Sequence, residues 1–264
     1  MQCANFWAKY PIEMILLLSV IVGVFIGATI GLIGSGGSLI AIPALTIFLN
    51  QDIVAATTTS ALIVTLTSLT AIVGRPRNQP DLSKAWIFPS IPGIIGAILG
   101  GWIFDSVSEM LIYSAISIMM LLAAFLVYKF QNDGYSKSRS MDFPILFILS
   151  LTTGFISGLL GNGGGFLIIP ILMRFGHLSF KVSVSSSQLF VLTNSTVALI
   201  SRFQFWSELA WGEILPLATA AIISVALFTK WSSDQESKRL VRIFSTTMVL
   251  GALFLILLRV GPLI

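Results

Sequence analysis

The sequence predicts an all-α membrane protein that crosses the bilayer several times and consists of two repeats of inverted topology. Of its 264 residues 56% are hydrophobic and 10% are charged, whereas about 25% of the residues of a soluble domain are charged. The mean hydropathy is +0.96, and apolar runs of roughly 20 residues recur along the chain. A glycine-rich segment occurs twice, which indicates an internal duplication. These observations exclude a water-soluble globular domain.

Six runs are long enough to cross a hydrocarbon layer of about 30 Å as single helices, at about 1.5 Å per residue. They are residues 53–74, 85–104, 107–128, 182–201, 209–230 and 240–260. Every tryptophan except Trp7 falls near a predicted helix end, where aromatic rings favour the headgroup region. Two other apolar stretches, 12–50 and 143–175, are interrupted by glycine clusters at 34–37 and 161–165. These stretches are therefore predicted to be broken helices.

The two broken stretches belong to one duplicated unit. An offset of 127 residues pairs Gly34 with Gly161 and continues without a gap to Arg75 and Arg202. Such duplication is common in secondary transporters. The predicted units are the first repeat 1–130, the polar linker 131–142 and the second repeat 143–264.

Lysine and arginine concentrate in four connectors, which are expected on the cytoplasmic side. The connectors are residues 75–84, 129–139, 174–181 and 230–242. Each broken stretch must then enter and leave on one side, and residues 143–175 provide about 50 Å of helix, too little for two full crossings. We therefore expect a glycine-tipped re-entrant hairpin plus three spanning helices in each repeat, with both termini outside. Lys9 and Arg202 are exceptions, because they place positive charge on the outer side.

The glycine clusters are the strongest candidates for a binding site. Non-helical backbone inside a bilayer needs protein or a water-filled cavity around it, so each break indicates a polar pocket. Short helices are expected at 38–49 and 166–175, and the free N–H groups at their starts attract anions. The two clusters are expected to meet near the midplane and enclose one anion. The predicted ligands are Gly34, Ser35, Gly36, Gly37 and Ser38 in the first cluster and Gly161, Asn162, Gly163, Gly164 and Gly165 in the second.

Helix packing is the alternative role for glycine, because small residues spaced by four let membrane helices approach closely. We assign this role to the glycines outside the clusters, Gly23, Gly27, Gly31, Gly154 and Gly158. Contiguous glycine suits a packed helix face poorly, since each glycine costs roughly 1 kcal/mol in a helix interior. The clusters are therefore assigned to the site.

Polar side chains on the equivalent helices 53–74 and 182–201 are expected to line an anion path. Ser187 and Asn194 share one helical face, and Ser60 is the repeat partner of Ser187. The alternative is that these groups bond back to helix carbonyls or to neighbouring helices.

Arg75 and Arg202 end these two helices and are candidate substrate ligands. A guanidinium is suited to sulfonate or carboxylate oxygens. The alternative is an interfacial anchor, since arginine at a helix end commonly extends to the headgroups.

Other chemistries find little support in the composition. With one histidine, His177, and one cysteine, Cys3, the chain lacks the residues for a hydrolytic triad or a metal cluster, so we predict no enzymatic activity, no metal and no cofactor. The sequence pI of 9.4 reflects the basic connectors rather than nucleic-acid binding. No Asp or Glu lies at mid-span, so no carboxylate proton carrier is apparent.

Two segments resemble the duplicated signature of the TauE/SafE family of sulfite exporters, also called sulfite/sulfonate uptake permeases. They are GATIGLIGSGGS at 27–38, followed by Pro43, and GFISGLLGNGGG at 154–165, followed by Pro170. The resemblance extends over nearly the whole chain in length, duplication and motif position. It implies transport, often export, of small sulfur-containing anions such as sulfite, organosulfonates, sulfoacetate or thiosulfate across a bacterial cytoplasmic (inner) membrane.

The residues and the resemblance together predict a secondary anion transporter embedded in the lipid bilayer. An anion held between the two hairpin tips would be exposed alternately to each side. A small-anion channel and a membrane scaffold for another complex remain alternative functions. A homo-oligomer is also compatible with the sequence.

Overall fold

The computed structural model describes residues 11–34, 39–74, 82–104, 107–130, 142–161, 164–233 and 235–259, and within these ranges it contains helices and no strand. The first half comprises α2 (Ile12–Ile33), α3 (Ala41–Phe48), α4 (Ile53–Val73), α5 (Leu82–Ile103) and α6 (Glu109–Phe130). The second half comprises α7 (Phe143–Leu160), α8 (Gly165–Arg174), α9 (Phe180–Ser201), the 3-10 helix η3 (Phe203–Glu208), α10 (Trp211–Ser233) and α11 (Ser237–Arg259).

The order of helix lengths repeats, as the duplication predicts. Each half has a long helix, a short helix and three long helices. The six predicted spans are single helices of 21 to 23 residues. Even the backbone repeats, because the two described non-glycine residues with positive φ are Asn50 and His177, 127 positions apart.

The two broken stretches each combine a long first arm with a short second arm, as the short helices expected at 38–49 and 166–175 imply. The helix breaks lie where the glycines predict them, at Gly34 (φ 77°) and at Gly161 and Gly164 (φ 69° and 63°). The first arms have 22 and 18 residues, about 33 and 27 Å, so each approaches a full crossing. The second arms, α3 and α8, have only 8 and 10 residues. Each stretch is thus a long helix followed by a half-length helix, which fits a segment too short for two full crossings.

Six helices in the described ranges are long and apolar enough to cross a membrane: α2, α4, α6, α7, α10 and α11. Helix α9 also has 22 residues, but it is rich in serine and falls below this hydropathy level. Its serines are tolerable because most of them are buried inside the protein.

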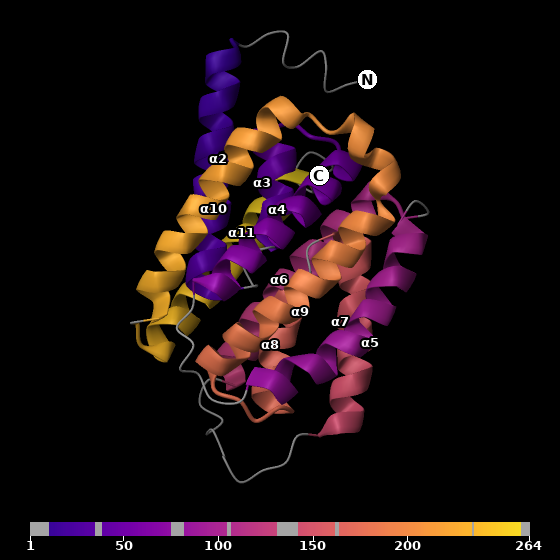
Figure 1. The fold of residues 1–264 in the computed structure, drawn as a ribbon, viewed down its shortest axis with the longest axis vertical. Coiled ribbons are helices and arrows are strands. Elements are labelled where there is room, and N and C mark those ends of the chain that lie inside the picture. Colours follow the sequence, from indigo (N-terminus) through magenta and orange to yellow (C-terminus); the bar gives the residue numbers. More distant parts are fainter. Residues whose placement is uncertain are drawn as a thin grey trace.

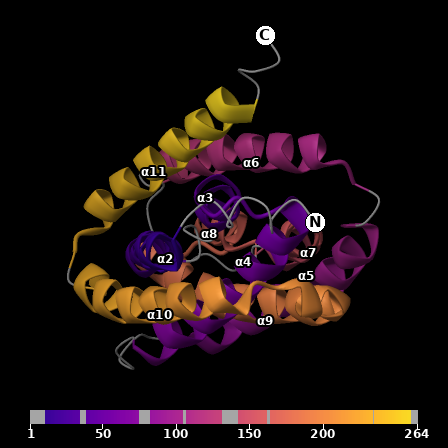
Figure 2. The ribbon, with the colours of Figure 1, turned by 90° about the horizontal axis from the view of Figure 1, so that it is seen from above.

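The halves are interleaved. Helix α2 packs along α10, and the equivalent helix α7 packs along α5. The other close pairs, α4 with α9 and α6 with α11, each join equivalent helices. Helix α2 begins at the top of the view in Figure 1 and α7 at the bottom, so these equivalent helices run in opposite directions. Seen from above, α3 and α8 lie in the middle, between α6 and α11 on one side and α9 and α10 on the other (Figure 2).

Glycine permits the close packing of α2 on α10 and of α7 on α5. A Cβ on Gly27 would meet the carbonyl oxygen of Ala221, and a Cβ on Gly158 would meet that of Ala97. Gly23, Gly31 and Gly154 have equally close neighbours in the facing helix. The geometry confirms the packing role of these five glycines.

We predict that Gly27→Leu separates α2 from α10 and lowers the stability of the protein by about 1–3 kcal/mol, the usual cost of overpacking. Thermal unfolding in detergent, followed by size-exclusion chromatography, measures this loss. Gly212→Ala is the matched control on α10, because no atom lies within 4 Å of the added Cβ. Equal melting temperatures for Gly27→Leu and the wild-type protein would contradict the packing role.

Charge divides between the two ends of the molecule. The α8–α9 and α10–α11 junctions lie at the lower end in Figure 1, and the start of α2 and of α10 at the upper end. The lower junctions carry Arg174, Lys181, Lys230, Lys238, Arg239 and Arg242. Described side chains at the upper end include Glu13 and Glu213. This is the asymmetry on which the predicted orientation rests.

Candidate anion site

A layer of buried polar side chains lies between α4 and α9. The two helices run antiparallel, since Ala61 packs with Ala198 while Thr65 donates to Ser195 at 3.0 Å. Fully buried polar residues line both helices: Thr57, Thr58, Thr59, Ser60, Thr67 and Ser68 on α4, and Ser183, Ser186, Ser187, Gln188, Asn194 and Ser195 on α9. Thr57, Thr58 and Thr67 donate to carbonyls of their own helix, so the groups without such a bond are the ones to consider as ligands.

The three predicted hydroxyl and amide ligands differ in what they bond. The Ser187 hydroxyl donates to the carbonyl of Val184 at 2.8 Å, as the back-bonding alternative expects. Asn194 Nδ2 donates to the carbonyl of Phe190 at 2.7 Å, but its Oδ1 has no hydrogen-bond partner among the described residues. The Ser60 hydroxyl, equally buried, has no partner in the described ranges either. Ser60 and the Asn194 oxygen are therefore the groups with unused bonding capacity.

Gln188 is a site candidate that the sequence did not single out. Its side chain is fully buried, and neither Nε2 nor Oε1 has a hydrogen-bond partner within the part of the chain that the structure describes. A buried amide without partners costs roughly 1–3 kcal/mol, so it indicates a site for water or a ligand. Its repeat partner is Ala61, which is apolar, so a comparison of the two halves does not indicate Gln188 as a binding residue.

The first glycine cluster meets α9. Gly34 is buried, and a Cβ there would contact Val184 and come within 3.4 Å of Gln188 Nε2. Its φ of 77° and ψ of −143° belong to a backbone region that only glycine adopts readily. Four other predicted ligands of this cluster, Ser35, Gly36, Gly37 and Ser38, lie outside the described residues, as do Arg75, Asn162 and Gly163.

The second cluster meets α4 in the equivalent way. A Cβ on Gly161 would lie 2.5 Å from the carbonyl oxygen of Thr57, the repeat partner of Val184, and 2.5 Å from the guanidinium of Arg202. Gly164 packs against Thr153 on α7, and α8 begins at Gly165. Each cluster thus lies against the polar helix of the opposite half.

The described glycines of the two clusters do not enclose a common pocket. Gly34 contacts the first turns of α9, whereas Gly161 lies beside Arg202, which follows the last turn of that helix. The positions 188 and 202 are separated by about 20 Å along the helix axis at 1.5 Å per residue. The two described breaks thus lie far apart along α9, and a meeting of the clusters at the midplane stays a prediction, because most of their residues lie outside the described ranges. The polar layer between α4 and α9 occupies the space between them.

Arg202 lies inside the protein and not at the headgroups. Its side chain is 1% exposed, and Nη2 donates to the carbonyls of Gly158 and Leu159 at 2.8 and 3.1 Å. The guanidinium lies 4.3 Å from the ring centroid of Phe104. A cation at the C-terminal end of α7 stabilises the negative end of the helix dipole. Arg202 thus does not act as an interfacial anchor.

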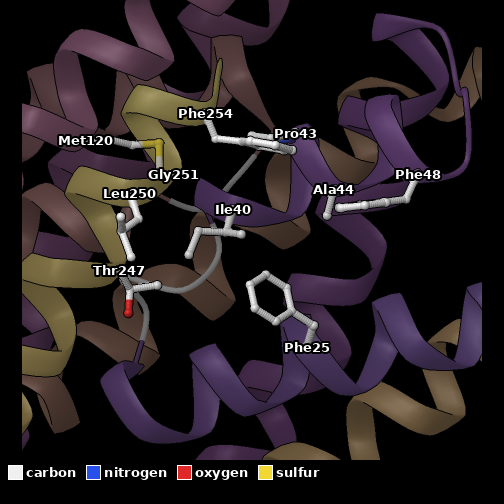
Figure 3. A pocket seen from close by; sticks show the side chains of 10 residues that line it. All are labelled: Phe25, Ile40, Pro43, Ala44, Phe48, Met120, Thr247, Leu250, Gly251 and Phe254. Carbon is white, nitrogen blue, oxygen red and sulfur yellow. The ribbon is translucent and has the colours of Figure 1, made fainter. Parts of the chain in front are cut away.

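An apolar groove of about 470 Å³ lies elsewhere, between α2, α3, α6 and α11. Figure 3 shows Phe25, Phe48 and Phe254 among its lining side chains, with Thr247 as the one polar member. Such a surface does not suit an anion. The groove does show a difference between the halves: α6 packs directly against α8, whereas this groove separates α11 from the equivalent helix α3.

Metal chemistry finds no support in the described residues, which contain no group of three His, Cys, Asp or Glu side chains able to hold an ion. His177 lies 3.7 Å from the carboxylate of Asp142, at the junction of α8 and α9. The polar layer, the two glycine breaks and Arg202 therefore form the candidate site.

Comparison with known proteins assigns the chain to a family. The family described as "Sulfite exporter TauE/SafE" matches residues 19–255. The chain belongs to the TauE/SafE family. Its relatives include "Probable membrane transporter protein YunE" of Bacillus subtilis (strain 168), 25% identical over 267 residues, which are 90% of this chain and 96% of that protein.

Two further relatives of this TauE/SafE protein carry similar names. "Probable membrane transporter protein MJ0441" of Methanocaldococcus jannaschii is 27% identical over 172 residues, 62% of this chain and 64% of that protein. A "Probable membrane transporter protein" of Xylella fastidiosa (strain 9a5c) is 24% identical over 255 residues, 91% and 95% of the two chains. No solved structure matches the chain significantly. Family, relatives and helices agree on a multi-pass membrane transporter.

Proposed function

We propose that the protein is a secondary transporter of small sulfur-containing anions, such as sulfite, sulfonates, sulfoacetate or thiosulfate. The observation that carries the proposal is the buried polar layer, where Ser60 and Gln188 lack hydrogen-bond partners among the described residues. Gln188 Nε2 and the Ser60 hydroxyl can donate hydrogen bonds, and the oxygens of an anion can accept them in place of water. The family description, a sulfite exporter, supports sulfur oxyanions and export.

The anion would pass along the layer from one glycine break to the other, rather than rest between two tips. The starts of α3 and α8 supply partial positive charge near each break, and Arg202 adds a full charge beside Gly161. Equivalent helices that run in opposite directions support two inverted repeats, which exchange roles in alternating access.

The orientation follows from the charges. The lower end of Figure 1, with its lysines and arginines, would face the cytoplasm of a bacterial cell across the inner membrane. Both termini would then lie outside.

A ligand panel tests the substrate class. Sulfite, thiosulfate, taurine and sulfoacetate are compared with acetate for stabilisation of the purified protein against heat. A ligand at 100 times its Kd stabilises by about 2.7 kcal/mol, so binding gives a clear rise in melting temperature. Stabilisation by a sulfur anion and saturable counterflow in proteoliposomes are the expected results. Flux without saturation or counterflow would favour a channel, and absence of any binding would contradict the proposal.

We predict that Gln188→Leu lowers anion affinity at least tenfold and leaves the ligand-free protein as stable as the wild type or more stable. The reason is that leucine of similar volume removes a buried amide whose bonds are unused. Thermal shift with and without the anion measures both effects. Thr193→Val is the control on the same helix, because the Thr193 hydroxyl already donates to Phe190 at 2.9 Å. An unchanged ligand shift in Gln188→Leu would remove this residue from the site.

A further inference from the structure

A second buried polar cluster lies at the end of the molecule where α10 begins, outside the layer between α4 and α9. It contains Glu213 in the first turn of α10 and Gln51 in the connection between α3 and α4, which are 9% and 7% exposed. The side-chain amide of Gln51 bonds the carboxylate of Glu213. In the described ranges, Glu213 Oε2 and Gln51 Oε1 have no hydrogen-bond partner.

Helix α2 adds a third polar group at this level. Gly23 packs on Leu217, and four residues later Gly27 packs on Ala221. A step of four residues along α2 thus matches a step of four residues along α10. One turn earlier, the same register places Ser19 level with Glu213. The Ser19 side chain is fully buried, and its hydroxyl has no partner among the residues described.

The charge of Glu213 is not balanced by any described cation. The neighbouring elements contribute Glu13 from α2 and Asp52 at the start of α4, both carboxyl groups, and Asp52 is engaged with the Ala55 N–H at 2.7 Å. The only basic residue of α10 is Lys230, in its last turn. Arg202 is held by the carbonyls that end α7. A buried carboxylate without a partner cation is costly, so this position calls for a compensating positive charge.

We propose that Glu213 binds and releases a proton during transport and couples the anion to the proton gradient. This inference rests on the proposed function. The sequence shows no carboxylate at mid-span, but Glu213 lies buried in the first turn of a spanning helix. A proton needs one acceptor oxygen, which Glu213 Oε2 offers.

Protonation of Glu213 can also affect the anion path through contacts between α10 and α4. A hydrogen bond to a charged carboxylate is roughly twice as strong as one to a neutral group, so a proton on Glu213 loosens the contact with Gln51. Gln51 lies two residues before α4, and the second turn of α4 carries Thr57 beside Gly161. Pro216 has no N–H for the carbonyl of Gly212, which leaves the first turn of α10 less tied to the rest of the helix. The proton would thereby change how α10 holds the start of α4.

The test uses the full-length protein in proteoliposomes with radiolabelled sulfite and thiosulfate. In the wild type we expect exchange of the anion between the two sides and accumulation driven by a pH gradient. Glu213→Gln is expected to retain exchange within about twofold and to lose pH-driven accumulation at least tenfold. Because each proton cancels one negative charge, the flux of this variant should depend more strongly on an imposed membrane potential. Glu13→Gln, an exposed carboxyl at the same end, is the matched control and should behave as the wild type.

Three results would overturn the inference. They are pH-driven accumulation in Glu213→Gln equal to wild type, accumulation driven by a sodium gradient but not by a pH gradient, and identical voltage dependence of the two proteins. Should Glu213→Gln fail to insert, Glu213→Asp is expected to shift the pH dependence of accumulation, and an unshifted dependence would equally overturn it. Absence of exchange in the wild-type protein would instead refute the proposed function, on which this inference depends.

Discussion

Replacing Arg202 with leucine is expected to abolish transport and to destabilise the protein by about 2–5 kcal/mol. The substitution leaves the carbonyls of Gly158 and Leu159 buried without their donor and removes the cation stacked on Phe104. Each buried acceptor that loses its donor costs roughly 1–3 kcal/mol. The loss also takes positive charge from beside Gly161, at one end of the proposed path.

Arg202→Lys tests whether the positive charge alone is sufficient or whether the shape of the guanidinium is also needed. Lysine keeps the positive charge but cannot span two carbonyls and lie flat on a ring, so we expect a folded protein with transport reduced at least tenfold. Thermal unfolding and anion counterflow measure the two effects. Arg239→Leu is the control, since that arginine is exposed and bonds Gln235 at 3.0 Å. Full transport by Arg202→Leu would show that the buried guanidinium has no part in the path.

The sequence was sufficient to predict the helices and the duplication. Apolar runs bounded by tryptophan and charge define α4, α5, α6, α9, α10 and α11, because span length is set by bilayer thickness. The offset of 127 residues reappears in the backbone at Asn50 and His177. Local patterns of this kind do not depend on which helices touch.

The arrangement of the site was less predictable, because it depends on contacts between distant segments. Nothing in the sequence shows that the Arg202 side chain turns inward to the end of α7, 43 residues earlier. The distance between Gly34 and Gly161 depends on how α2 and α7 pack against the other helices, which the sequence pattern does not show. Gln188 was missed because the repeat partner, Ala61, is apolar.

Alanine substitutions at the two glycine breaks should both impair transport, and a second substitution in the contacting helix should restore transport at only one of them. Gly34→Ala and Gly161→Ala both place a Cβ on a residue with positive φ, at φ 77° and 69°. The strain costs about 1–2 kcal/mol at Gly161, which is left-handed helical, and about 1–3 kcal/mol at Gly34, whose ψ is −143°. The added Cβ at Gly34 also meets the side chain of Val184, whereas at Gly161 it meets the backbone carbonyl of Thr57. We expect at least tenfold loss of transport in both variants, with Gly161→Ala the more severe. Gly74→Ala, at a φ of −76°, should transport normally.

Val184→Ala should restore part of the transport lost in Gly34→Ala, because it removes the methyl group that the new Cβ strikes. The equivalent change, Thr57→Ala, should not rescue Gly161→Ala, since the obstacle there is a carbonyl oxygen that every residue carries. Counterflow rates of the four single and two double variants give the two coupling energies. Rescue at Gly34 alone would show that the break must approach α9 closely for transport. Rescue at neither position, with all variants folded, would mean that the φ strain is the whole effect, whereas normal transport by both glycine variants would remove the breaks from the mechanism.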